Sequence, residues 1–469
     1  MRISARKGVK FYQNGAISLL VEAARRPDTL VVPLSVVKGE RLTLAVQPGS
    51  RVHKYQALAL PEGDGSPVYA PGSGRFEQIV ERRIPGLGKT PCALLRLDGE
   101  EHDVSPKTRR RGRFTPEGGA QILEGRGPVR GELSLRRLIG IAKRAAIVDE
   151  RDGQRLWRKL EALEDGPPPF AVYVDAIDDQ PFMSASLAIL ASFGEDIREA
   201  LRLLCGALNA SGGILARWNR EADALLGEAF MEYPVTYVQG KYPSAPAVDV
   251  YVETIQGVRF GAGACLALAR AVAEGLPQTT AVVTVAGDGV QTPLNLEVPL
   301  GTSVEDLLTQ CGASGVIQRV VAGGLMSGRI IGPAAPLLPS LTALTAQSAT
   351  TEPPRTACTG CGRCASVCPA GLAPFYLYQA AKGTGLEGLR KLGGADCIEC
   401  GCCSYVCPAG LPLSAGTRWI RRNLEALEQR RRADLENQQS NASAKEGQDT
   451  EQDQMQAEGK EAAHHGQAQ

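Results

Sequence analysis

Eight of the thirteen cysteines fall into two runs with the same spacing. Each run reads C-x2-C-x2-C-x3-C and is followed by a proline, which is the spacing of bacterial ferredoxin-type 4Fe–4S sites. Three cysteines at these short intervals can bind three irons of one cubane, and the fourth points away and ligates the other cluster. We therefore predict two 4Fe–4S clusters with crossed ligands. One is predicted to be held by Cys358, Cys361, Cys364 and Cys407, and the other by Cys397, Cys400, Cys403 and Cys368.

Zinc and disulfide bonds are the alternative uses of these cysteines. A zinc site takes four ligands, typically two C-x2-C pairs, and leaves no role for the third and fourth cysteine of each run. Disulfides need an oxidising compartment, and nothing at the N-terminus predicts a secretory signal. Cys402 lies beside Cys403 and is predicted to be a small buried residue, although it could also replace a neighbour in a damaged cluster. No residue is predicted to be catalytic.

The composition limits the classes of partner. Lys and Arg number 52 against 51 Asp and Glu, so no net field favours nucleic acid. Thirteen cysteines indicate a reducing environment in which thiolates remain available for metal. No apolar run approaches the ~18 residues that can span a bilayer. We therefore expect no transmembrane segment, and membrane association only through partner proteins.

Short apolar runs broken by Gly and Pro, from residue 30 to residue 97, predict a compact all-β module. Its pattern resembles the lipoyl and biotinyl barrel-sandwich carriers, which modify a lysine at a hairpin tip. Residues 57–69 contain no lysine, so we expect a docking role for the module. Gly88-Lys89-Thr90 resembles the end of a P-loop, but Arg83 stands where that motif needs glycine, which excludes it.

The remaining patterns predict a multidomain protein of α/β and β domains that ends in an α-helical, ferredoxin-like domain. Apolar helical spacing and buried strands alternate up to residue 278, which indicates an α/β layer. The dense basic stretch at 107–113 is predicted to be a solvated linker. The expected parts are an N-terminal segment at 1–29, a barrel-sandwich domain at 30–100, an α/β domain at 128–278, a β-grasp domain at 279–332, a linker at 333–354, a double-cluster domain at 355–426 and a disordered tail at 427–469.

The order of these domains resembles the C subunit of the Rnf ion-translocating electron-transport complex. Its α/β and β-grasp parts also resemble the flavin- and NADH-binding subunit of respiratory complex I. The matching stretches are Lys241-Tyr-Pro243, Val283-Thr-Val-Ala-Gly287, Pro293-Leu-Asn295, Val298-Pro-Leu-Gly-Thr302, Gly323-Gly-Leu-Met326, Asp396-Cys-Ile-Glu-Cys-Gly401 and Ser404-Tyr-Val-Cys-Pro408. The resemblance implies an iron–sulfur subunit at the cytoplasmic face of the membrane, with membrane-embedded subunits and a ferredoxin-like carrier as partners.

The chain departs from the family where flavin should bind. The family's loop, Gly-x-Gly-Gly-Ala-Gly-Phe-Pro-Thr, wraps the flavin phosphate, but this chain reads Leu138-Ile-Gly-Ile-Ala-Lys-Arg-Ala-Ala-Ile-Val148. The family's Asn-Gly-Ala-Glu-Cys-Glu-Pro strand end has become Asp175-Ala-Ile-Asp-Asp-Gln-Pro181. Gly261-Ala-Gly-Ala264 survives, but a lone Gly-x-Gly is weak evidence. We therefore expect binding of FMN and NADH to be lost.

Three functions remain open at this point. The first is electron transfer in an Rnf-type complex, and eight intact ligands favour it. The second is an adaptor or structural paralogue for which docking is the main role. The third is a cobalamin-reductase-like protein, which would need the flavin. Whether the chain is an enzyme by itself depends on that flavin.

Overall fold

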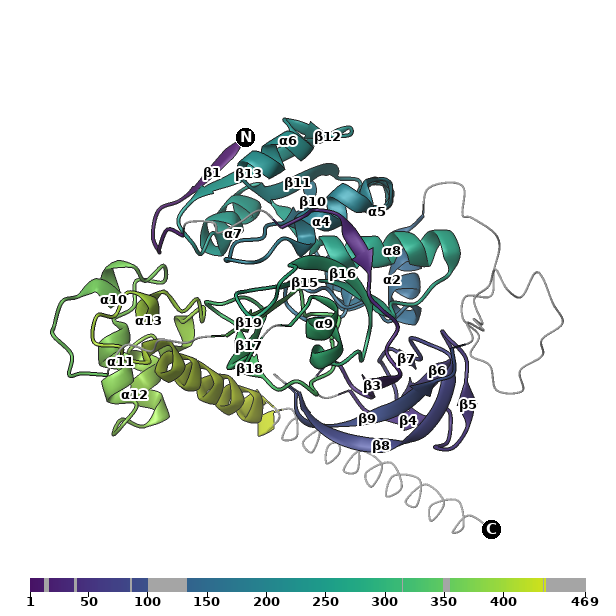
Figure 1. Cartoon of the computed structure of the whole chain (residues 1–469). Coiled ribbons are helices and arrows are strands. Elements are labelled where there is room, and N and C mark those ends of the chain that lie inside the picture. Colours follow the sequence, from purple (N-terminus) through teal and green to yellow (C-terminus); the bar gives the residue numbers. More distant parts are fainter. Residues whose placement is uncertain are drawn as a thin grey trace, which may run out of the picture. The chain divides into compact units, whose positions relative to one another are not determined.

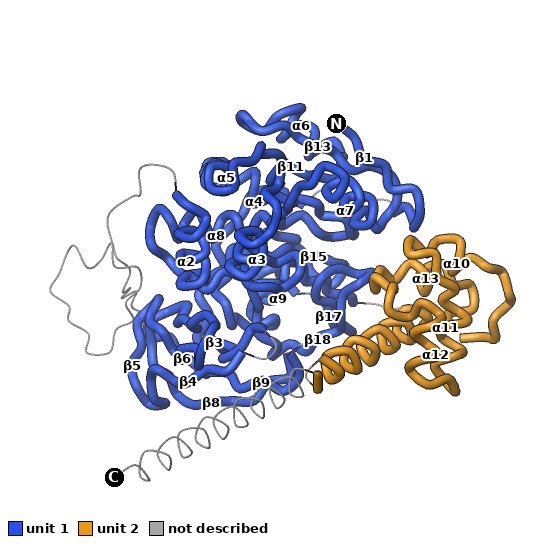
Figure 2. The backbone as a smooth tube through the Cα atoms, turned by 180° about the vertical axis from the view of Figure 1, so that it is seen from behind, with its two compact units in different colours: residues 1–352 blue, residues 353–469 orange. Residues whose placement is uncertain are grey.

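The computed structural model describes residues 1–11, 17–37, 40–84, 87–99, 133–313, 315–348, 355–432 and 434–435. The basic stretch at 107–113 lies outside these residues. The chain divides into two compact units, residues 1–352 and residues 353–469 (Figure 2). Among the described residues, no helix combines the length and the apolar character needed to cross a membrane.

The barrel-sandwich module consists of two small sheets that enclose an apolar core. Residues of both sheets contribute to this core, including Leu30, Val52, Leu58, Phe76 and Leu95. The strand that begins at Gly88 pairs along its length with the preceding strand, so Gly88-Lys89-Thr90 is part of a hairpin. One sheet has the order β3 (Thr29–Pro33), β9 (Gly88–Leu97), β8 (Gly74–Ile84) and β5 (Arg51–Val52), and the other has the order β4 (Leu42–Leu44), β6 (Ala57–Pro61) and β7 (Val68–Tyr69).

The α/β module is built on a parallel sheet with helices on both faces (Figure 1). The strand Ala171–Ala176, which has a neighbouring strand on each side, is buried at every position, as expected when both faces are covered. The sheet order is β1 (Arg2–Ala5), β13 (Tyr233–Gly240), β11 (Ser211–Arg217), β10 (Ala171–Ala176) and β14 (Gly257–Gly261), and β12 (Ala229–Phe230) pairs antiparallel with β13. The helices are α2 (Leu135–Arg144), α3 (Leu156–Glu164), α4 (Ala185–Ser192), α5 (Gly194–Leu208), α6 (Arg220–Leu226), α7 (Ala245–Thr254) and α8 (Ala262–Glu274).

The β-grasp module follows as a six-stranded sheet packed on one short helix. The helix begins after Ser303, whose hydroxyl accepts the Asp306 N–H at 3.1 Å, so the predicted cap is confirmed. The sheet order is β18 (Arg329–Ile331), β17 (Arg319–Ala322), β19 (Ala343–Gln347), β15 (Thr280–Ala286), β16 (Leu294–Pro299) and β2 (Val21–Ala23), and the helix is α9 (Val304–Gln310).

Two predicted boundaries differ from the structure. The stretch predicted as a linker contains β19, a buried strand that pairs with both β15 and β17. The N-terminal segment supplies β1 to the α/β sheet and β2 to the β-grasp sheet. These strands are completed by partners far away in the sequence, so the local composition does not reveal them.

The barrel-sandwich module is docked onto the α/β module through buried polar contacts. The Arg155 guanidinium donates twice to the Glu40 carboxylate at 2.8 Å, and both side chains are almost fully buried. The Trp157 indole N–H donates to Ser66 at 3.1 Å. The Tyr69 hydroxyl donates to the Arg144 carbonyl at 2.7 Å. These contacts agree with the docking role expected for a module without a carrier lysine.

In the described part of the second unit, the regular secondary structure is helical, and the cysteines lie in loops and in the one-turn helices that follow them. Two short helices lie between the two cysteine runs, and a longer helix covers residues 413–432 and 434–435. Leu377, Leu389, Ile420 and Leu424 form its core. The prediction of disorder from residue 427 is therefore wrong as far as residue 432, and residues 436–469 lie outside the described part. The named elements are α10 (Arg363–Ser366), α11 (Pro374–Ala380), α12 (Leu386–Lys391), η1 (Gly394–Asp396) and α13 (Cys402–Tyr405).

Candidate metal centres and the edge of the parallel sheet

The two cysteine runs adopt the same local structure at a constant offset in the sequence. Gly360 and Gly362 of the first loop have positive φ values of 69°, and their counterparts Glu399 and Gly401 have φ values of 56° and 77°. Each loop is followed by a one-turn helix, α10 or α13, which begins one residue before the third cysteine of its run. Repeated left-handed residues fold each loop back sharply, so successive thiols face a common centre.

The first set of thiols surrounds a cavity of about 170 Å³. Its lining includes all four cysteines predicted for one cluster, which are Cys358, Cys361, Cys364 and Cys407. This space is several times the ~30 Å³ that a water molecule occupies, so it suits a group larger than one ion. The backbone N–H of Arg363 lowers the pKa of Cys361, which favours the thiolate that metal binding requires.

The second set of thiols is identified by mutual electrostatic effects. Burial, and then the charges of Cys400, Cys397 and Cys368, raise the pKa of Cys403 to about 12. Burial also raises the pKa of Cys368, and Cys400 and Cys397 raise it further. Coulomb effects decline with distance, so these contributions favour Cys368 as a neighbour of Cys397 and Cys400. The structure places Cys407 beside the three thiols of the first run, and the crossed ligation of the two clusters stays a prediction.

These residues fit 4Fe–4S clusters, because thiolates are the ligands of such clusters and four are gathered at each centre. Within the described ranges, no three His, Cys, Asp or Glu side chains meet at a position for a single metal ion. When bound, each cluster would supply a one-electron redox group. The chain's own contribution is to hold the thiols and to control their access to solvent.

The two centres differ in their exposure to solvent. Cys358 and Cys361 are exposed, whereas Cys403 is buried and its neighbour Cys402 has no exposed surface. The prediction that Cys402 is a small buried residue is therefore confirmed. A hydrogen bond with the Cys402 side chain lowers the pKa of Cys400 to about 7. The second centre is thus the more enclosed of the two.

The helix at residues 413–432 holds the second cysteine loop in place. The Arg421 guanidinium donates to the Cys397 carbonyl at 2.9 Å. Glu399 accepts an ion pair from Arg418 at 3.0 Å and lies 3.7 Å from Arg422. Sequence reasoning missed these arginines, and the only available signal was their dense spacing after the second run.

The segment that replaces the family's flavin-phosphate loop is helical, as predicted. Residues 138–144 belong to α2, and Leu138, Ile139, Ile141 and Ala142 face the core. A helix uses its N–H groups for its own hydrogen bonds, so this segment offers no cradle of free N–H groups to a phosphate.

The strand end Asp175–Pro181 is committed to internal contacts. Asp178 accepts the N–H of Leu187 at 3.0 Å and that of Ser186 at 3.4 Å, at the start of α4. Burial raises the pKa of Asp178 to about 6. Asp179 forms an ion pair with Arg217 and accepts the Ser244 N–H at 2.6 Å. Both carboxylates therefore already have partners.

Gln180 fastens the β-grasp module to this strand end. Its carbonyl oxygen accepts the N–H groups of Met326 at 2.9 Å and Ser327 at 3.2 Å, and its amide donates to the Ser327 hydroxyl at 2.7 Å. A Cβ at Gly324 would lie 2.6 Å from the Gln180 side chain, and Gly324 has a φ of 92°. The Gly-Gly turn is thus shaped around Gln180.

Glu150 occupies the N-terminus of α8, and sequence reasoning did not identify it. Its two carboxylate oxygens accept the N–H groups of Gly263 at 2.6 Å and Ala264 at 2.9 Å. A Cβ at Gly261 would lie 2.3 Å from the carboxylate, so the surviving Gly-x-Gly makes room for this side chain. Burial, and then the charge of Asp149, raise the pKa of Glu150 to about 7.

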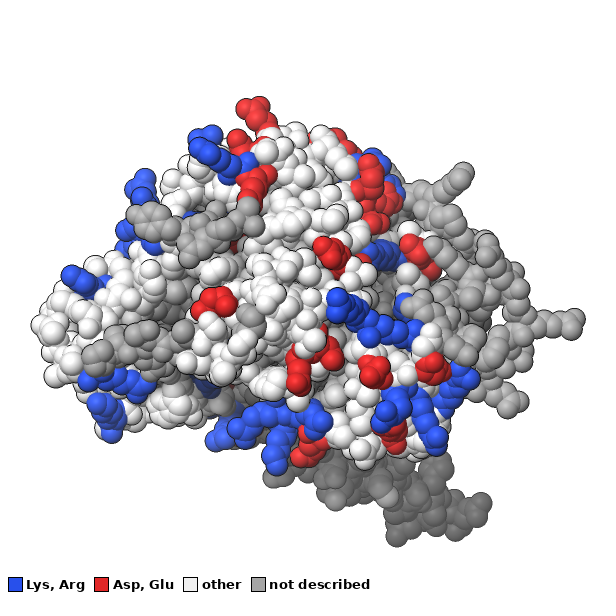
Figure 3. All heavy atoms as spheres, in the orientation of Figure 1, with Lys and Arg blue, Asp and Glu red and all other residues white. Residues whose placement is uncertain are grey.

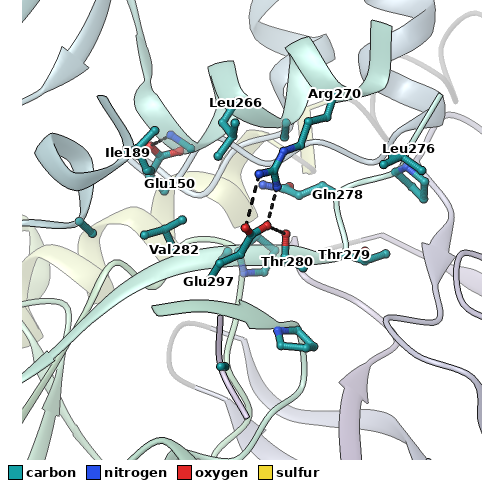
Figure 4. Close-up of a pocket in the computed structure, with 18 of the residues that line it drawn as sticks. Glu150, Ile189, Leu266, Arg270, Leu276, Gln278, Thr279, Thr280, Val282 and Glu297 are labelled. Atoms are coloured by element: carbon teal, nitrogen blue, oxygen red, sulfur yellow. Dashed lines mark hydrogen bonds and ion pairs between the residues drawn. The ribbon is translucent and has the colours of Figure 1, made fainter. Parts of the chain in front are cut away.

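A cavity of about 300 Å³ lies beside Glu150, among the three modules of the first unit. Figure 4 shows that Arg270 and Glu297 point toward each other across it. Their ion pair measures 2.5 Å, and the Thr280 hydroxyl donates to Glu297 at 2.9 Å. The principal charged groups of this cavity therefore neutralise each other.

Comparisons with known proteins agree with this architecture. Residues 3–100 match the model of the RnfC barrel sandwich hybrid domain, residues 282–327 match the SLBB domain, and residues 354–446 match the 4Fe–4S dicluster domain. A NAD+-reducing NiFe-hydrogenase chain aligns over 62% of this chain and 53% of its own, at 14% identity. Its TM-score of 0.38 is too low to support a shared fold.

Curated relatives match most of this chain over part of their own length. The chain is 27% identical to the C subunit of an ion-translocating oxidoreductase complex from Erwinia tasmaniensis, over 76% of this chain and 45% of that protein. It is 24% identical to the C subunit of a proton-translocating ferredoxin:NAD(+) oxidoreductase complex from Clostridium ljungdahlii, over 66% of this chain and 68% of that protein. The chain thus spans about half the length of most of these relatives. An RnfC-type barrel-sandwich domain, an SLBB domain and a dicluster domain in one chain confirm the predicted resemblance to the C subunits of Rnf-type complexes.

Proposed function

We propose that this chain is the iron–sulfur electron-transfer subunit of an Rnf-type, membrane-associated complex. The observation that carries the proposal is the cavity lined by Cys358, Cys361 and Cys364 of the first run and by Cys407, the fourth cysteine of the second run. Electrons would pass through two 4Fe–4S clusters held by these eight cysteines. The domain matches and the names of the relatives support this assignment.

The partners that follow are membrane-embedded subunits and a ferredoxin-like electron carrier. The chain would act at the cytoplasmic face of the membrane and be attached through those subunits. Co-expression with the membrane-embedded subunits of the same complex should retain this chain in the membrane fraction, and expression alone should not. A chain that stays in the supernatant in both cases would contradict the proposal.

We further propose that the chain binds neither FMN nor NADH. Family positions for the flavin are filled by helix α2, by the paired carboxylates of Asp178 and Asp179, and by Gln180. Purified protein with full clusters should contain about eight irons per chain and no stoichiometric FMN. About one FMN per chain, measured by fluorescence after acid release, would contradict this and favour a cobalamin-reductase-like or NADH-oxidising protein.

An adaptor role is the second candidate. It is favoured by the conversion of the strand end 175–181 into a joint between modules. Iron content distinguishes the two functions. Protein that folds and joins its complex with about four irons or fewer after anaerobic reconstitution would support the adaptor and contradict the two-cluster assignment.

A further inference from the structure

The two halves of the cluster unit differ in exposure and in charge, and both differences point to the same surface. Cys358 and Cys361 of the first centre are exposed, and the rim of its cavity includes Arg363 and Tyr376. Tyr376 has 72% of its surface exposed, which is unusual for a large aromatic side chain without a partner to cover it. In the second centre, Cys368 and Cys403 are buried, Cys397 and Cys400 are half-buried, and Arg421 of the helix at 413–432 contacts the cysteine loop.

The half of the unit that carries the exposed centre is uniformly basic. Residues 355–386 contain three basic residues, Arg355, Arg363 and Lys382, and no Asp or Glu. All three are exposed. In the other half, acidic residues such as Glu387 and Glu399 form ion pairs with arginines. Figure 3 shows blue and uncharged surface, without red, at the far left, where Figure 1 labels α10, α11 and α12.

We propose that this basic rim, defined as Arg363 and Tyr376 at the cavity together with the exposed Arg355 and Lys382 of the same half, docks an acidic one-electron carrier protein at the first centre. The proposal rests on the function proposed above and assigns the exchange of electrons with soluble carriers to one centre. A positive surface around an exposed redox site steers a negative partner into contact. An exposed tyrosine beside an arginine is the kind of pair that anchors a small interface.

The chemistry of the exchange is limited to one electron. The reduced carrier loses one electron and the first centre gains it, and no bond or proton moves between the proteins. Contacts of this kind bury little surface, often less than ~1,200 Å², and depend strongly on charge. The second centre is less suited to exchange with a soluble carrier, because Cys368 and Cys403 are buried.

The test measures binding of the full-length, anaerobically reconstituted protein to a purified acidic two-cluster ferredoxin by titration calorimetry. We expect binding that weakens severalfold between about 50 and 200 mM salt. Arg363→Glu should weaken it about tenfold or more, since it reverses a charge at the contact. The matched control is Arg430→Glu, which makes the same charge change at an exposed position on the C-terminal helix and should leave the dissociation constant within about twofold.

Several outcomes would overturn the inference. Equal effects of Arg363→Glu and Arg430→Glu would show that only net charge matters. If cytochrome c, a basic carrier, bound as tightly as the acidic ferredoxin, charge complementarity would not explain binding at the basic rim. Binding of anionic lipid vesicles that Arg363→Glu abolishes, without ferredoxin binding, would assign the rim to a membrane surface. Self-association that this variant abolishes would assign it to a second copy.

Iron content keeps this test separate from the proposed function. Protein that holds about eight irons and is reduced by dithionite, but does not bind ferredoxin, contradicts only the docking inference. Protein that cannot be loaded with iron contradicts the proposed function itself. Arg363 lines the cavity of the first centre, so the iron content of Arg363→Glu is measured as well, and its binding is compared only for protein that holds as much iron as the parent.

Discussion

The functional groups at the carboxyl edge of the parallel sheet differ from those in the cysteine loops of the second unit in whether the chain itself supplies their partners. At the sheet edge, Asp179 is paired with Arg217, and Glu150 is bonded to the start of α8. At the first centre, four thiols line a cavity. The carboxylates at the sheet edge are thus bonded to other groups of the same chain, whereas the four thiols surround a space that can hold a bound group.

The difference bears on the proposed loss of flavin binding in a chain that resembles a flavoprotein family. The N-terminus of a helix attracts an anion because its N–H groups and its dipole favour negative charge. At α8 that anion is Glu150, so a phosphate would have to displace a buried carboxylate. No comparable group from the described part of the chain fills the cavity that Cys358, Cys361, Cys364 and Cys407 line.

The largest expected effect tests the crossed arrangement of the thiols. Cys361→Ser and Cys368→Ser should each lower the iron content by about four per chain, because each removes one ligand. Cys361→Ser should lose the same electron paramagnetic resonance signal as Cys407→Ser, and Cys368→Ser the same signal as Cys400→Ser. Cys402→Ser is the control and should retain both signals. Identical spectra for the Cys361 and Cys368 variants would contradict the crossing.

The next effect concerns the anion at the sheet edge. The folded-state pKa of Glu150 is about 7, above its ordinary value of 4.5. Between these pH values the folded protein binds more protons than the unfolded one, so the free energy of unfolding falls as pH rises through this window. The loss should approach roughly 3 kcal/mol. Urea unfolding followed through Trp157 fluorescence at pH 4.5 and 7.5 measures it.

A matched pair of variants identifies the group responsible. Glu150→Gln should reduce the change in the free energy of unfolding between pH 4.5 and 7. Asp178→Asn should instead reduce this change between pH 3.8, which equals the ordinary pKa of an aspartate, and about pH 6, because burial raises the pKa of Asp178 as it raises that of Glu150. A slope between pH 6 and 7 that survives in the Glu150 variant would show that this carboxylate does not titrate there.

A smaller effect is expected at the joint between modules. Gln180→Ala should reduce the free energy of unfolding of the first unit by about 1–3 kcal/mol, because it leaves the N–H groups of Met326 and Ser327 without their acceptor. Gln180→Glu keeps the acceptor and should cost less. Flavin analysis of Gln180→Glu sharpens the comparison, because restoring one family carboxylate should not restore FMN. Stoichiometric FMN in that variant would mean that the pocket persists.

The smallest effect is expected in the second cysteine loop. Glu399→Gln removes partly exposed ion pairs with Arg418 and Arg422, which are worth about 1 kcal/mol or less. Glu399→Gly also loses them but relieves a positive φ, as Gly360 does in the first loop. The two variants should therefore differ in thermal unfolding temperature, with Glu399→Gly the higher. A lower temperature for Glu399→Gly would show that the ion pairs outweigh the backbone.

The sequence predicted what depends on local spacing. The cysteine loops, the helix in place of the flavin loop and the cap at Ser303 all follow from residues close together in the chain. Strands β1, β2 and β19 were missed because they are short and are completed by distant partners. Glu150 was missed because its partners, Gly263 and Ala264, become neighbours only through the fold.

Strands β1 and β2 also impose an order of events during synthesis. The amino group of Met1 contacts a carbonyl 234 residues further along the chain, and the Ser18 carbonyl accepts a hydrogen bond from Asn295, 277 residues away. A ribosome adds about 5–20 residues per second, so these first-made strands wait on the order of tens of seconds for their partners. The two sheets can therefore be completed only after β13, which ends at Gly240, and β16, which ends at Pro299, have been made. Until then both strands present unpaired backbone groups to other nascent chains.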